Sequence, residues 1–151
     1  MADRALAPCV DHKAVENRLV TMRKSVGQLS APGPLDRERL ARSPESGMVV
    51  ERVLALLADL AFEVNREVAA VVLGERPPTA AAALGAAVRA GLIDAELAAA
   101  LTPADGPHHI QVQLYLDTEP ELVAGVVAAA AAGYQEYVSQ VAAWTAATAH
   151  C

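Results

Sequence analysis

The residues best suited to chemistry lie in the stretch "GPHHIQVQLYLD", residues 106–117. His108 and His109 are adjacent, and Gln113 and Tyr115 follow them. An imidazole suits proton transfer because its pKa lies near neutrality. Adjacent histidines can also bind a metal ion, but no third ligand stands at a suitable spacing, so we predict no metal site and no cofactor. The stretch is therefore read either as a catalytic loop or as an exposed turn.

A second candidate set is the pair Asp59 and Glu63, four residues apart in an apolar region expected to form one long helix over 44–73. That spacing places both carboxylates on one helix face. A carboxylate removed from water needs a partner. One interpretation pairs the acids with Arg52, with Arg66 or with a neighbouring helix. The other makes them a polar line that faces a site or a subunit interface.

The composition indicates the elements that must position these residues. The chain is 54% hydrophobic but only 3% aromatic, and Ala, Val and Leu dominate, which suits closely packed helices better than sheets. A chain of 151 residues suffices for one domain. We therefore expect a single domain over 1–151, with 1–10 and 148–151 as flexible tails.

Location and redox state are also predicted from the sequence. We expect no secretory leader and no membrane span, and hence a cytoplasmic protein. Cys9 and Cys151 form no zinc pattern, and no structural disulfide is expected in a reducing compartment.

The charge distribution limits the partners. Residues 1–45 hold eight Lys and Arg against six acids, whereas residues 90–151 hold seven acids and no Lys or Arg. Nucleic acids are bound largely through cationic contacts to phosphate, which the C-terminal part cannot supply. We therefore expect no DNA and no membrane partner, and RNA only if the site is active.

Periodicity predicts helices over 11–29, 44–73, 80–90, 94–101 and 120–147, with a short one near 35–42. The expected caps and stops are Ser43, Gly74, Thr79, Gly91 and Asp94. Apolar stripes follow the first helix (Val15, Leu19, Met22, Val26, Leu29) and the last one (Leu122, Val126, Val127, Ala130, Tyr134, Tyr137, Val138, Val141, Trp144). We expect an all-α fold, an antiparallel helical bundle of three long helices plus short ones.

Residues 110–116 depart from the helical pattern, because apolar and polar side chains alternate strictly there, as in a half-buried strand. A lone strand in a helical bundle has nothing to pair with. We therefore expect this segment to be a helix or an extended loop.

The order of these elements, with "PPTAAAALGAAVRAGLI", "DAELAAAL" and "DGPHHIQVQLYLDTEPELV", resembles the HepT-like toxins of the HEPN superfamily. The resemblance covers roughly residues 12–145. It implies an all-α bundle that forms a homodimer, a metal-independent ribonuclease site, and a nucleotidyltransferase-type antitoxin as partner.

The motif of that family is an arginine, four residues, a histidine, one residue and a tyrosine. By this resemblance the arginine falls on His108 and the polar residue after it on His109. The catalytic histidine falls on Gln113 and the tyrosine on Tyr115, which in related pairs can accept AMP from the antitoxin. The aromatic residue before the arginine falls on Pro107. The family's acidic pair falls on the two carboxylates of the long helix, Asp59 and Glu63.

The departures from the motif affect the chemistry directly. Gln113 can form hydrogen bonds but cannot shuttle a proton, and acid–base catalysis contributes about 10²–10⁴ in rate. Arginine binds two phosphate oxygens and is always charged, whereas His108 is cationic only when protonated. Tyr115 has a simpler interpretation as an amphipathic residue at a helix contact.

Three functions remain open. The chain is a HepT-like protein whose ribonuclease site has decayed. Alternatively, it is an active ribonuclease that uses His108 and His109 across a dimer. In the third interpretation it is a non-enzymatic helical module that binds another protein, since fold does not fix function.

Overall fold

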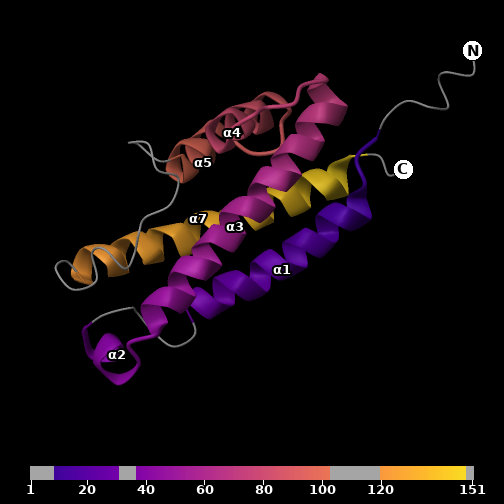
Figure 1. The fold of residues 1–151 in the computed structure, drawn as a ribbon. Helices are drawn as coiled ribbons and strands as arrows, with labels where there is room; N and C mark the ends of the chain where they lie inside the picture. The colour runs from indigo at the N-terminus through magenta and orange to yellow at the C-terminus, as the bar shows by residue number, and fades with distance from the viewer. Residues whose placement is uncertain (1–8, 31–36, 103–119, 149–151) are drawn as a thin grey trace, which may run out of the picture.

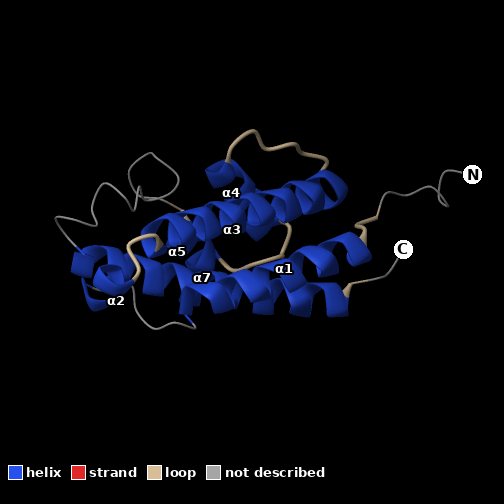
Figure 2. Cartoon of the chain, turned by 60° about the horizontal axis from the view of Figure 1, so that its bottom comes forward, coloured by secondary structure: helices blue, strands red, loops and turns tan. Residues whose placement is uncertain are grey.

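The computed structural model of the chain describes residues 9–30, 37–102 and 120–148. Every regular element in these ranges is helical (Figures 1 and 2). They are α1 (His12–Ser30), α2 (Arg37–Arg42), α3 (Ser46–Val68), the π-helical turn η2 (Ala69–Leu73), α4 (Ala80–Arg89), α5 (Ala95–Leu101) and α7 (Pro120–Ala147). The predicted all-α class is confirmed for the described residues.

Local side-chain chemistry sets several helix ends, at Thr79 and Asp94 as predicted and also at Asp11, which was expected as the first helical residue. The carboxylates of Asp11 and Asp94 and the hydroxyl of Thr79 each accept a hydrogen bond from the backbone N–H three residues on, at 3.1, 2.8 and 3.1 Å respectively. These bonds satisfy N–H groups that the first turn leaves without a partner. Gly74 ends η2 with φ +68° and Gly91 follows α4 with φ +82°, a left-handed conformation that only glycine adopts at little cost.

The start of α3 differs from the prediction. Helix α3 begins at Ser46, so the expected cap at Ser43 is wrong. The Ser43 N–H donates to the Arg39 carbonyl at 2.8 Å, which extends the end of α2. Its hydroxyl donates to a carboxylate oxygen of Glu45 at 2.9 Å and is therefore turned away from a capping role. A turn thus separates α2 from α3, and the long helix begins two residues later than the expected start at residue 44.

Helix α1 packs against both α3 and α7 and runs antiparallel to them (Figure 1). Near its start, the His12 ring contacts Trp144 and Thr148 at the end of α7. Farther along, Arg18 reaches Glu63 of α3. Helix α4 packs on α3, and α5 packs on α7. The long helices therefore surround one common core.

The core draws on all the long helices. Four residues of the stripe predicted for α1 are buried (Val15, Leu19, Met22, Leu29), and the fifth, Val26, packs against them. On α7 the buried positions include Val123, Val127, Tyr137, Val138 and Val141. Leu122 was expected in this stripe but is 50% exposed, so that assignment is wrong. The stripe of α7 passes through its neighbour Val123, one helical position away.

The two ends of the described chain meet. The His12 ring stacks on Trp144 with centroids 6.2 Å apart and an interplanar angle of 9°. Its Nδ1 donates to the Val10 carbonyl at 3.1 Å, and its Nε2 shares a hydrogen bond with the Thr148 hydroxyl at 3.0 Å. Val10 is buried. Val10 and Thr148 lie in the segments 1–10 and 148–151, which the sequence analysis expected to be flexible tails.

Cys9, just before α1, is disulfide-bonded. The expectation of no structural disulfide is therefore wrong for this residue. That expectation rested on an assumed reducing compartment. Cys151, the second cysteine of the sequence, lies outside the described residues. In the described part of the chain, no helix has an apolar stretch long enough to span a membrane.

Candidate functional site

The motif segment joins α5 to α7. Its predicted site residues His108, His109, Gln113 and Tyr115 lie outside the described residues, as does the alternating stretch 110–116. The candidate site is therefore built from the residues that flank this connection and from the acidic pair on α3.

The acidic pair is exposed on α3, and its two members have different neighbours. A carboxylate oxygen of Glu63 lies 3.5 Å from Nε of Arg18, whose Nη1 also lies 3.2 Å from Glu67. The pairing of Glu63 with a neighbouring helix, one of the two interpretations of the sequence, is thus observed. Arg66 does not serve this role, because its guanidinium lies over the Phe62 ring, 5.3 Å from the centroid.

Asp59 acts electrostatically on a residue of α7 instead. Burial, and after it the negative charge of Asp59, raises the pKa of Tyr134 to about 12. A carboxylate that influences a phenol in this way lies close to it. The charge of Asp59 therefore acts on α7, whereas Glu63 pairs with Arg18 of α1.

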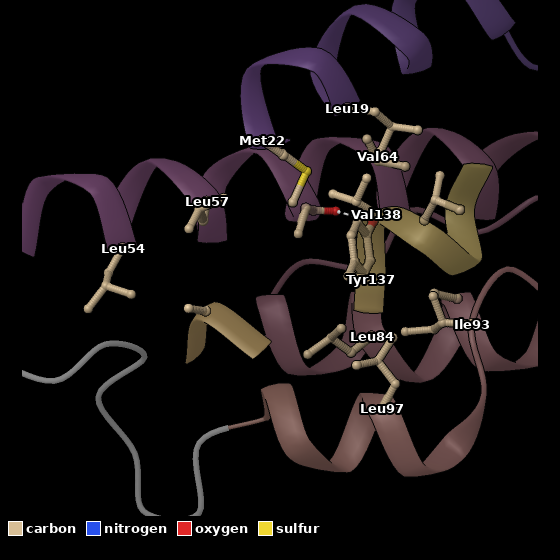
Figure 3. Packing of buried hydrophobic residues seen from close by; sticks show 14 of the residues in the cluster. Leu19, Met22, Leu54, Leu57, Val64, Leu84, Ile93, Leu97, Tyr137 and Val138 are labelled. Atoms are coloured by element: carbon tan, nitrogen blue, oxygen red, sulfur yellow. Dashed lines mark hydrogen bonds between the residues drawn. The ribbon is translucent and has the colours of Figure 1, made fainter. Parts of the chain in front are cut away.

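A buried hydrogen bond joins α3 and α7 next to this position. The Tyr137 hydroxyl donates to Oδ1 of Asn65 at 2.7 Å and lies 3.3 Å from the Ala61 carbonyl. Both side chains are almost fully enclosed, with exposed fractions of 0% for Tyr137 and 1% for Asn65. Figure 3 shows the Tyr137 ring among the buried side chains of the surrounding helices. Burial, and after it the neighbouring Tyr134, raises the pKa of Tyr137, so this phenol stays neutral.

Asn65 and Tyr134 also line a small cavity between α3, α4, α5 and α7. Its volume is about 40 Å³, and its other lining residues are apolar (Ala58, Ala61, Phe62, Ala80, Leu84, Leu101). A volume of this size holds a few water molecules, whereas ligand pockets are roughly 300–1,000 Å³. The cavity is therefore too small for a nucleotide.

Sequence reasoning missed Asn65, although a signal was present. Asn65 stands one turn after Ala61 and three residues before Val68, inside the apolar row of α3. A lone amide in an apolar row must find a hydrogen-bond partner. Its partner, Tyr137, was assigned only to an apolar stripe. The sequence could have indicated that a partner exists, but not which residue it is.

The described part of the site holds no obvious catalytic machinery. Within 9–30, 37–102 and 120–148, no three His, Cys, Asp or Glu side chains gather where they could hold a metal ion. The groups that do meet are a neutral phenol, an amide and ion-paired carboxylates. These groups stabilise contacts between helices.

Comparison with known proteins adds no relative. The chain matches no family model, no curated protein and no solved structure.

Proposed function

We propose that this chain is a HepT-like protein of the HEPN type, the toxin-type component of a toxin–antitoxin pair, whose RNA cleavage is lost or weakened. The observation that carries the proposal is the pair of replacements in the motif, His108 for the arginine and Gln113 for the histidine. The replaced groups would contribute a permanent positive charge and a proton-transfer group. Tyr115 is retained and remains the candidate AMP acceptor.

The helical framework supports the proposal without testing it. Helix α7 begins at Pro120, and α4 and α5 lie in two of the three stretches whose sequences carry the resemblance. The resemblance implies a ribonuclease site supported by the acidic pair of the long helix. The acids of α3, which such a site would use for support, are instead bound to Arg18 or adjacent to Tyr134. A chain that has lost RNA cleavage could keep these neighbours of the two acids, because they do not depend on catalysis.

The proposal also includes a homodimer and a nucleotidyltransferase-type antitoxin as partner. Large apolar side chains on one side of α3 are compatible with self-association. Val49 is 52% exposed and Leu56 is 41% exposed. They are seven residues apart, so they lie two turns apart on the same side of the helix. A dimer would remove both from water, and a Val49→Glu and Leu56→Glu double variant would then be monomeric in light scattering.

The decisive experiment restores the motif. The chain is expressed with His108→Arg and Gln113→His together, beside the unchanged protein and each single variant. We expect growth arrest and RNA cleavage only in the doubly restored protein. The matched control adds Tyr115→Phe to the restored protein, which removes the motif tyrosine and should reduce toxicity.

Two results would contradict the proposal. Cleavage of RNA by the unchanged protein, abolished by His108→Ala, would show that the site is active as it stands. A restored protein that folds as the unchanged one does, by circular dichroism, and yet remains harmless would favour the non-enzymatic module. Co-purification with a small nucleotidyltransferase would still support the pairing in that case.

A further inference from the structure

A second, larger depression lies between α1 and α7. It is a groove of about 640 Å³, and its described lining residues are Arg23, Val26, Gly27, Gln135, Val138, Ser139 and Ala142. This volume falls within the range of small-molecule sites, roughly 300–1,000 Å³. The groove uses none of the residues of the motif or of the acidic pair.

The floor and the rim of the groove differ in chemistry. Val26, Val138 and Ala142 provide apolar surface. Gly27 leaves its part of the groove open, because a Cβ added there would meet no atom within 4 Å. The apolar floor and the open space above it fit the hydrocarbon part of a ligand.

The rim offers hydrogen-bond donors and one positive charge. Arg23 is exposed and takes part in none of the ion pairs among the described residues, and Gln135 and Ser139 add an amide and a hydroxyl. No acid lines the described groove. The nearest acid along α7, Glu136, accepts a hydrogen bond from Gln140, which also bonds to the cap of α5 on another side of the helix. The groove is therefore complementary to an anion.

We propose that the α1–α7 groove binds a small amphipathic carboxylate. The carboxylate would accept hydrogen bonds from the Arg23 guanidinium, whose paired N–H groups match two carboxylate oxygens. Ser139 and Gln135 would donate to the same oxygens. An alkyl chain would lie over Val26 and Val138 and occupy the space above Gly27. One guanidinium balances one carboxylate charge, whereas a phosphate would leave charge uncompensated. This proposal is independent of the proposed function.

Octanoate is the probe, titrated into the full chain by isothermal calorimetry and by NMR of labelled protein. We expect saturable binding with a Kd below about 1 mM, with amide shifts centred on Gly27 and Ser139. Octanol has a chain of the same length without the charge, and octylamine has the opposite charge. Octanol should bind at least about tenfold more weakly, because it makes no charged hydrogen bond, and octylamine should not bind.

Three variants locate the site. Arg23→Gln should weaken octanoate binding about tenfold or more, and Gly27→Leu should abolish it by filling the groove. Lys24→Gln removes a neighbouring exposed charge outside the lining and should leave the affinity unchanged. Circular dichroism and urea unfolding establish that each variant is folded. Equal octanoate affinity in all variants, equal affinity for octanol, or no saturable binding would each overturn the proposal.

Discussion

The hydrogen bond between Tyr137 and Asn65 allows a sharp test of how the core is held together. Tyr137→Phe removes the hydroxyl and leaves Oδ1 of Asn65, at 1% exposure, without the donor that lies 2.7 Å away. An unsatisfied buried acceptor costs about 1–3 kcal/mol of folding free energy. Asn65→Leu leaves the hydroxyl with only the Ala61 carbonyl at 3.3 Å, so its cost should be about 1–2 kcal/mol.

The double variant distinguishes the bond from the burial of either side chain. When phenylalanine and leucine replace both residues, no polar group is left without a partner, and the pair becomes an apolar contact. We therefore expect the double variant to be no less stable than either single variant. The coupling free energy should be about 1–2 kcal/mol. Urea unfolding measures it, since 1 kcal/mol shifts the midpoint by roughly 0.5 M for a domain of this size.

A matched variant is available one turn away. Tyr134→Phe removes a hydroxyl that makes no hydrogen bond within the described part of the chain, and it should change the stability by less than about 0.5 kcal/mol. The reasoning is refuted if the two single variants add without coupling. It is refuted equally if Tyr134→Phe is as harmful as Tyr137→Phe.

Three further predictions concern the helix ends, pH and the disulfide. Thr79→Ala removes the cap of α4 and should lower the free energy of unfolding by about 1 kcal/mol in urea, whereas Thr79→Ser should restore it. The pKa of Tyr134 is raised from 10.0 to about 12 in the folded chain, so the folded state keeps this proton when the unfolded state has lost it. Stability should therefore fall as pH rises from 10 through 12, and more steeply than in Tyr134→Phe, as followed by unfolding and by phenolate absorbance. A reducing agent should lower the unfolding temperature of the oxidised protein and should have no effect on the unfolding temperature of Cys9→Ser. Equal responses of the two proteins would show that the disulfide does not stabilise the fold.

The helix ends were predictable because they depend on nearby residues. Asp11, Thr79 and Asp94 each cap a helix through a backbone N–H only three residues away. Gly74 and Gly91 adopt the left-handed conformation that stops a helix. Ser43 does not cap α3 because its N–H bonds to the last turn of α2 and its hydroxyl bonds to the Glu45 carboxylate.

Contacts between distant residues were not predictable from one sequence. The sequence could require a partner for Asn65, but Tyr137 lies 72 residues away and was one of several polar groups on other helices. The face of α7 was also harder to assign than that of α1. The buried row passes through Val123 and leaves Leu122 exposed, a difference of one position in a segment where nearly every residue is apolar.

In the candidate site, too, contacts between distant residues were harder to predict than features of the local sequence. The motif residues were assigned through a family resemblance and stay a prediction, whereas the neighbours of the acids depended on what lay beside α3. Glu63 is ion-paired with Arg18, and the charge of Asp59 acts on Tyr134, so both acids have described neighbours on other helices.

This separation determines how the restoration experiment is interpreted. The two changes, His108→Arg and Gln113→His, lie in the connection between α5 and α7 and alter no contact among the described helices. The restored protein should therefore keep the stability of the unchanged one. Its activity then depends on the restored groups alone. If it folds normally and cleaves no RNA even with Asp59 and Glu63 intact, the helical framework does not carry a latent ribonuclease site.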